Sequence, residues 1–164
     1  MRYNTTLTVN GIAYPVEVDA GASLLQVVRE TIGLTGSKEG CDDSECGACM
    51  MLLDGKPVNS CSYLALQAEG REVTTVEGLA AGDELSPLQS AFLQHGGVQC
   101  GFCTPGMLIS ATALLAANPA PSEDEVRIAL SGNLCRCTGY QGILAAVRQA
   151  AGTTSPRGAG GTER

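Results

Sequence analysis

The sequence is poor in aromatic, histidine and basic residues. Its 164 residues include no tryptophan, two phenylalanines and one histidine, and 10 basic residues stand against 17 acidic ones, a formal net charge of −7. An acidic chain offers no basic footprint to nucleic acid or to an anionic membrane surface. The shortage of aromatic side chains excludes a large core. Two units of roughly 75 residues would each have a marginal core that bound metal can stabilise.

The chain also has no long apolar run. The N-terminal segment MRYNTTLTVNG contains no apolar signal region and no twin-arginine motif, and stretches such as MLISATALLAA are too short to cross a bilayer. We therefore expect no membrane association and a cytoplasmic location, where cysteines stay reduced. The single histidine, His95, falls at a predicted helix end, which favours a capping or surface residue over a proton-transfer group.

What the sequence does contain is eight cysteines in two groups of four. The first group consists of Cys41, Cys46, Cys49 and Cys61, spaced C-x4-C-x2-C with the fourth after eleven residues. This spacing is typical of the plant-type [2Fe–2S] loop, and Gly40 and Gly47 allow the backbone to approach a cluster closely. Zinc and disulfides are the alternatives. Zinc sites favour C-x2-C pairs and disulfides need an oxidising compartment, so both are disfavoured.

The second cysteine group combines two distant motifs. Cys100 and Cys103 lie in QCGFCTPG, and Cys135 and Cys137 lie in NLCRCTGY, with thirty-one residues between the two pairs. Spacing alone leaves an iron–sulfur cluster and a zinc site about equally open.

The first half of the chain has the pattern of a small sheet. Residues 2–9 and 12–18 alternate polar and apolar around Asn10-Gly11, a strong hairpin signal. Ser23 is the expected N-cap of a helix that ends at Gly33. After the cysteine loop we expect strands at 50–53 and 58–61, a short helix at 63–68 and a strand at 72–75. This order predicts a β-grasp ferredoxin-like domain over residues 1–76, with a connecting segment at 77–85.

From Ser86 onward the hydrophobic period becomes helical. Helices are predicted from 86 to about 95, over 104–117, from a capping box at 122–125 to 130, and over 141–151. Each helix pair carries two cysteines, so neither completes a four-ligand site alone. We predict a four-helix bundle over residues 86–151 with a metal site at one end, and a flexible polar tail at 152–164. The fold class is therefore α+β.

These motifs carry a family resemblance. Gly40-CDDSECGAC, GVQCGFCTPGM and SGNLCRCTGYQGI resemble the small iron–sulfur subunit of the molybdenum hydroxylase (xanthine oxidase) family, over about residues 2–151. The resemblance implies two [2Fe–2S] clusters, one for each cysteine group. It also implies electron transfer from molybdenum–pterin on a large partner subunit to FAD on a medium partner subunit. By the same match Gln99 and Cys137 lie against the pterin, and no catalytic residue belongs to this chain.

The resemblance further implies a heteromeric complex, expected as a dimer of heterotrimers. The expected substrate, oxidised on the large subunit, is an N-heteroaromatic compound, a purine or an aldehyde. Alternatives are the small subunit of a carbon monoxide dehydrogenase or of a 4-hydroxybenzoyl-CoA reductase, a stand-alone two-cluster ferredoxin, or a zinc-stapled adaptor. Copurification with a large and a medium chain distinguishes a subunit from the last two.

Overall fold

The fold begins with a hairpin that its turn residues dictate. In the computed structural model, which describes residues 1–153, β1 (Arg2–Val9) and β2 (Ile12–Asp19) pair antiparallel around Asn10-Gly11. Both turn residues have positive φ, 52° and 76°, which asparagine and glycine tolerate better than other residues. The predicted hairpin is therefore confirmed.

The hairpin is one edge of a five-stranded mixed sheet of order β2-β1-β5-β3-β4. Its other strands are β3 (Met50–Leu53), β4 (Lys56–Asn59) and β5 (Glu72–Thr74). Strand β5 runs parallel to β1 and antiparallel to β3, so the last strand along the chain lies in the middle of the sheet. This arrangement confirms the β-grasp ferredoxin-like fold.

The helix packed against this sheet changes character along its length. Ser23 forms a capping box with Gln26 at the start of α1 (Leu24–Gln26), and the chain then widens into the π-helix η1 (Val27–Ile32). Gly33, with φ 88°, ends it as predicted. The widened turn was not predicted. It accompanies a contact outside the helix: Arg29 Nη1 donates hydrogen bonds to the carbonyl oxygens of Thr35 and Ser37 at 2.8 and 2.6 Å.

Two 3₁₀ turns complete this part, η2 (Ala65–Ala68) and η3 (Val76–Leu79). The second is largely within the segment expected only to connect two domains. It is instead part of the packing, because Val76 and Leu79 lie against the helical core. Glu77 Oε1 also accepts a hydrogen bond from the backbone N–H of Gly36 at 2.8 Å. The segment therefore contacts both halves of the chain.

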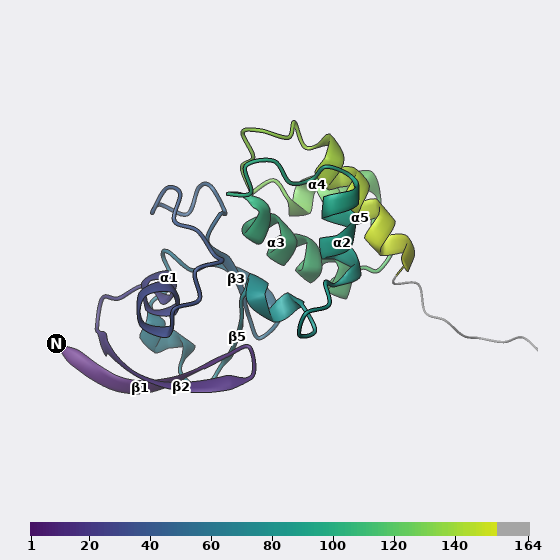
Figure 1. The fold of residues 1–164 in the computed structure, drawn as a ribbon. Helices are drawn as coiled ribbons and strands as arrows, with labels where there is room; N and C mark the ends of the chain where they lie inside the picture. Colours follow the sequence, from purple (N-terminus) through teal and green to yellow (C-terminus); the bar gives the residue numbers. More distant parts are fainter. Residues whose placement is uncertain (154–164) are drawn as a thin grey trace, which may run out of the picture.

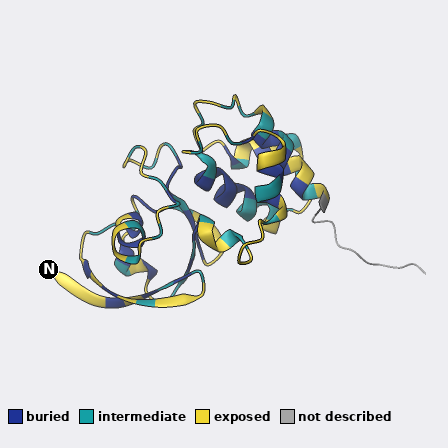
Figure 2. Ribbon diagram, in the orientation of Figure 1, coloured by how far each residue is buried: buried dark blue, intermediate teal, exposed yellow. Residues whose placement is uncertain are grey.

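The second half forms the predicted four helices: α2 (Pro87–Gln94), α3 (Thr104–Ala117), α4 (Glu123–Ala129) and α5 (Gln141–Thr153). Ser86 and Ser122 form the capping boxes that start α2 and α4. Phe92, Met107 and Ile143 are fully buried in the shared core, which Figure 2 shows in dark blue. Helix α5 includes residues 152 and 153, which were expected in the tail, and the rest of that tail, 154–164, lies outside the described residues.

Helix α3 joins the two halves. It contacts α2 and α4 on one side and β3 and β4 on the other, and Figure 1 shows it between the sheet and the other helices. The cysteine loop of residues 38–49 and the loops before α3 and α5 lie at the same upper side of the molecule in that view. Over residues 1–153, every helix is too short or too polar to traverse a bilayer.

Candidate metal centres

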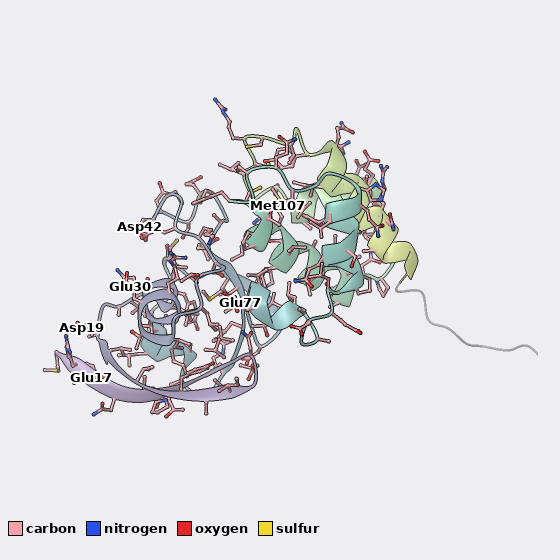
Figure 3. The ribbon with its side chains drawn as sticks, viewed as in Figure 1. Glu17, Asp19, Glu30, Asp42, Glu77 and Met107 are labelled. Carbon is pink, nitrogen blue, oxygen red and sulfur yellow. The ribbon has the colours of Figure 1, made fainter. Side chains whose placement is uncertain are left out.

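The first cysteine group lies on the loop before β3 and just after β4. Asp42 and Ser44 have positive φ, 63° and 67°, so the loop curls back between its cysteines. The backbone N–H of Cys46 lies 3.4 Å from Cys41 Sγ, and Ser60 Oγ donates to the Cys49 carbonyl at 2.6 Å. Figure 3 shows Asp42 at the outer end of the loop, away from the helices. The loop thus turns its sulfurs inward and its carboxylates outward.

The thiols of this group interact in pairs. Burial raises the pKa of Cys49 to about 11, and the adjacent Cys61 thiol adds to the rise. Burial also raises the pKa of Cys46, helped by the Cys41 thiol. Burial alone would raise the pKa of Cys61 as well, but the Ser62 hydroxyl and the neighbouring Cys49 thiol bring it below its ordinary value. The pairs are Cys41 with Cys46 and Cys49 with Cys61.

The second group assembles from the loops before α3 and before α5, as predicted. The Sγ atoms of Cys100 and Cys137 are 3.4 Å apart, and both residues are exposed. Cys103 and Cys135 are both half-buried. Burial raises the pKa of Cys103 to about 12, and the Cys135 thiol reinforces the rise. Here too the four thiols meet as two pairs.

Paired thiols suit a di-iron cluster better than a single ion. Four thiolates hold the two irons of a [2Fe–2S] cluster, so two pairs meet its need. A structural zinc ion instead requires four ligands to converge on one point. Within residues 1–153, no three histidine, cysteine or acidic side chains come close enough to share one ion. The donor sets therefore fit two [2Fe–2S] clusters.

Buried hydroxyls next to the cysteines support the same fit. Thr104 Oγ1 and Ser37 Oγ are buried and have no hydrogen-bond partner among the described residues, as is also true of Thr5 Oγ1 in β1. Leaving such a group unsatisfied costs about 1–3 kcal/mol. Thr104 directly follows Cys103, and Ser37 directly precedes the first cysteine loop. Cluster sulfur atoms are acceptors that such hydroxyls can use.

Asn133 links the two cysteine groups. Its side chain is 2% exposed, accepts from Ser110 Oγ at 2.7 Å and donates to the Gly47 carbonyl at 3.0 Å. The next residue, Leu134, donates its backbone N–H to the Cys46 carbonyl at 2.9 Å. Each cysteine loop is thus hydrogen-bonded to the other. Sequence reasoning missed Asn133, although it lies two positions before Cys135.

The contact between the loops leaves no room for side chains at two glycines. A Cβ at Gly47 would lie 2.2 Å from the Gly132 carbonyl oxygen, and one at Gly106 would lie 2.1 Å from the Gly47 carbonyl oxygen. Gly47 also has φ 70°, which disfavours other residues. The sequence indicated Gly47 as a loop residue, but the close approach from α3 depends on the tertiary fold.

Tyr140 braces the second loop. Its hydroxyl donates to the Asn133 carbonyl at 3.0 Å and accepts from the Cys135 N–H at 2.9 Å. Its backbone holds φ 66°, an uncommon value for a residue with a large side chain. Thr138 makes a further contact, since its Oγ1 lies 3.0 Å from Cys135 Sγ. Both residues belong to the NLCRCTGY motif, which is the sequence signal that could have identified them as part of this site.

Gln99 and Cys137, the residues expected to face the pterin, are both exposed at the second cysteine group. Two apolar side chains on the same two loops are also open to solvent, Phe102 at 47% and Leu134 at 58%. Both lie close to the first cysteine loop, Phe102 near Gly40 and Leu134 through its N–H bond to the Cys46 carbonyl. The end of the molecule that carries the second group is therefore a partly apolar surface that includes two of its sulfur ligands.

Comparison with protein families supports two cluster-binding units. The family described as "2Fe-2S iron-sulfur cluster binding domain" matches residues 7–85, and the family described as "[2Fe-2S] binding domain" matches residues 75–148. The two matches overlap in the segment that contains η3.

Relatives extend over nearly the whole chain. The nicotinate dehydrogenase small FeS subunit of Eubacterium barkeri is 50% identical over 144 residues, which cover 88% of this chain and 92% of the relative. The nicotine 6-hydroxylase small subunit of Paenarthrobacter nicotinovorans is 54% identical over 151 residues, 92% of this chain and 91% of the relative. A chain of quinoline 2-oxidoreductase from Pseudomonas putida 86 superimposes with a TM-score of 0.90 at 48% identity, covering 93% and 95% of the two chains.

Proposed function

Because this chain belongs to the iron–sulfur subunits of the molybdenum hydroxylase family, we propose that it serves as the electron-transfer subunit of a heteromeric oxidoreductase. When bound, its two [2Fe–2S] clusters supply one-electron carriers between molybdenum–pterin on a large partner subunit and FAD on a medium partner subunit. The chain's own residues hold the clusters, fix their spacing and dock on the partners. The observation that carries the proposal is the meeting of two four-thiol groups across one hydrogen-bonded contact.

The ligand assignment follows the thiol pairs. Cys41, Cys46, Cys49 and Cys61 hold the first cluster, and Cys100, Cys103, Cys135 and Cys137 hold the second. Cysteine binds iron as the thiolate, so the raised pKa values of Cys49 and Cys103 would make cluster loading dependent on pH.

Gln99 and Cys137 are the residues we assign to the face toward the molybdenum–pterin. A glutamine amide both donates and accepts hydrogen bonds, so it can pair with the pterin's amine and ring nitrogens. The exposure of Cys137 supports this orientation, because an exposed ligand leaves a short path from the second cluster to a partner's cofactor. The more buried first group then lies on the route toward the FAD subunit.

The partner surface around the second group has the composition of an interface. Aromatic and apolar side chains are enriched at the centre of protein interfaces, and Phe102 and Leu134 are exposed on the two loops that carry this group. We propose a complex with one large and one medium subunit, paired as a dimer of heterotrimers. A cytoplasmic location fits the eight cysteines, all of them free thiols in the structure.

The substrate belongs to the large subunit, and we propose an N-heteroaromatic compound. Relatives named for nicotinate, nicotine and quinoline support this class. Aldehydes and purines are the next candidates. The aldehyde oxidoreductase iron-sulfur-binding subunit PaoA of Escherichia coli K12 is 43% identical, and the xanthine dehydrogenase iron-sulfur-binding subunit of Escherichia coli O157:H7 is 48% identical.

The test is analysis of the complex purified anaerobically with its neighbouring chains. We expect about four irons and four sulfides in this chain, two of each per cluster, and two distinct electron paramagnetic resonance (EPR) signals on reduction. Cys103→Ser should abolish one signal and Cys46→Ser the other. Ser131→Ala, an exposed change in the turn before NLCRCTGY, is the control and should leave both. A single signal in the unmodified complex, or zinc in place of the second cluster, refutes the proposal.

A further inference from the structure

Thr138 makes two contacts with one sulfur atom of the second cysteine group. Its Oγ1 lies 3.0 Å from Cys135 Sγ, and its backbone N–H lies 3.4 Å from the same sulfur. Both distances are within the range for hydrogen bonds to sulfur. Neither contact was anticipated from the sequence, where Thr138 simply follows the C-x-C pair.

The direction of the hydroxyl hydrogen bond is fixed by its surroundings. The backbone N–H of Tyr140 donates to Thr138 Oγ1 at 3.2 Å, which uses an acceptor site of the oxygen and leaves its proton free. A metal-bound cysteine is a thiolate with no proton of its own, so the Thr138 hydroxyl has to be the donor. The hydroxyl therefore points its proton at Cys135 Sγ.

The backbone around this contact is held in place by hydrogen bonds within the chain. The Tyr140 hydroxyl bridges the Asn133 carbonyl and the Cys135 N–H at 3.0 and 2.9 Å. Asn133 in turn is buried and bonded to Ser110 and Gly47. The Thr138 donor is thus part of a rigid loop, so it stabilises a charged acceptor without reorganisation.

We propose that Thr138 is a positioning residue that raises the reduction potential of the second cluster through its hydroxyl hydrogen bond to Cys135. The inference rests on the proposed function, because it requires Cys135 to be a cluster ligand. Reduction adds one electron from the reductant and breaks no bond. The added negative charge strengthens a hydrogen bond donated to the thiolate, so the bond favours the reduced form.

The first cysteine group has only a weaker counterpart. The Ser62 and Ser44 hydroxyls lie 3.6 and 4.0 Å from Cys61 Sγ and are also hydrogen-bonded to each other. One of the two protons is therefore engaged between the hydroxyls. The hydroxyl contribution to the potential is accordingly larger at the second cluster than at the first.

The test is an EPR-monitored redox titration of the whole complex carrying Thr138→Val, which keeps the side chain's shape and removes the hydroxyl. We expect the equilibrium constant for reducing the second cluster to fall about tenfold, a 59 mV decrease for a one-electron couple. The first cluster should keep its midpoint. Thr138→Ser should retain the unmodified midpoint at both clusters, and Thr112→Val, in the middle of α3, is the matched control without effect.

Two outcomes overturn the proposal. The first is a Thr138→Val complex with both clusters and an unchanged second midpoint. The second is a Thr138→Ser complex whose midpoint falls as far as that of Thr138→Val, since the methyl group and not the hydroxyl would then matter. If valine prevents assembly of the second cluster, Thr138→Ala is titrated with the same expectation, and failure of both variants to assemble it also overturns the proposal. An unmodified complex with only one cluster would instead refute the proposed function.

Discussion

Replacing Asn133 by alanine should weaken the contact between the two cysteine loops. The change removes an acceptor from Ser110 Oγ and a donor from the Gly47 carbonyl. Ser110 is 4% exposed and Gly47 is buried, so water cannot replace either partner without entering the core. The backbone contact from Leu134 to Cys46 remains, and the variant should therefore still fold.

The magnitude follows from what the two groups can do after the change. A buried polar group left without a partner costs about 1–3 kcal/mol, which would give roughly 2–6 kcal/mol for two. Both groups have partial substitutes, however. The Met50 N–H already donates to the Gly47 carbonyl at 3.2 Å, and the Ser110 hydroxyl can turn to the carbonyl four residues earlier in α3. We therefore expect a loss of about 2 kcal/mol from a total stability of roughly 5–15 kcal/mol.

The assay is the rate at which visible iron–sulfur absorbance disappears in urea, because cluster loss is irreversible and reports a rate. If the contact is already broken in the transition state for unfolding, a loss of about 2 kcal/mol corresponds to a roughly 30-fold faster decay. Asn4→Ala, an exposed asparagine in β1, is the control and should change stability by less than about 0.5 kcal/mol.

A double-mutant cycle provides the refutation. Because Ser110 already lacks its partner in Asn133→Ala, adding Ser110→Ala should cost less than it does in the unmodified chain. Additive effects of the two changes would show that the hydrogen bond between Asn133 and Ser110 contributes nothing to stability. Decay of the Asn133→Ala protein at the unmodified rate would refute the argument equally well.

Three further predictions concern packing, charge and metal. Gly106→Ala should destabilise the protein by about 1–3 kcal/mol despite the better helix propensity of alanine, because the new Cβ would meet the Gly47 carbonyl. The control is Gly152→Ala, whose Cβ would have nothing within 4 Å, and it should be neutral or slightly stabilising in the same urea assay. The hydrogen bond from Arg127, reinforced by its charge and that of Arg148, holds the pKa of Glu123 below its ordinary value, so Glu123→Gln should lower the urea midpoint at neutral pH. The difference should begin to shrink as the pH approaches about 4.5, the ordinary value, and should be lost as the pH falls through the lower pKa of the folded state. Removing iron with a chelator should lower the melting temperature. Asp42 and Ser44 of the first loop have positive φ, which costs about 1–3 kcal/mol of backbone strain each, and without iron no ligand bonds offset this cost.

Local signals predicted most of the fold. The N-caps at Ser23 and Ser86, the capping box at Ser122 and the turn at Asn10-Gly11 depend on neighbouring residues alone, and the structure has each where the sequence places it. The π-helical widening of η1 could not be predicted in this way. It occurs where Arg29 reaches carbonyls beyond the helix, and such contacts exist only once the loop has folded.

The candidate sites likewise contain residues that local patterns reveal and residues that only the tertiary fold reveals. Cysteine spacing is a local pattern and was sufficient to group the eight thiols, because each motif carries two or three ligands on one short loop. Asn133 has no such pattern. Its role depends on Gly47, which is 86 positions away, and on a helix face between them. Thr138 stands within the NLCRCTGY motif, but nothing in the sequence shows which sulfur its hydroxyl approaches.

The two cysteine groups are distant only in sequence; in space they share one hydrogen-bonded segment, residues 133 and 134. Asn133 and Leu134 bond to the first loop, and the following residue, Cys135, belongs to the second site. Small domains with small cores tolerate loop motion, and electron transfer requires a constant distance between carriers. A segment that is both the end of one site and the bonding partner of the other meets this requirement, since neither loop moves without breaking buried hydrogen bonds.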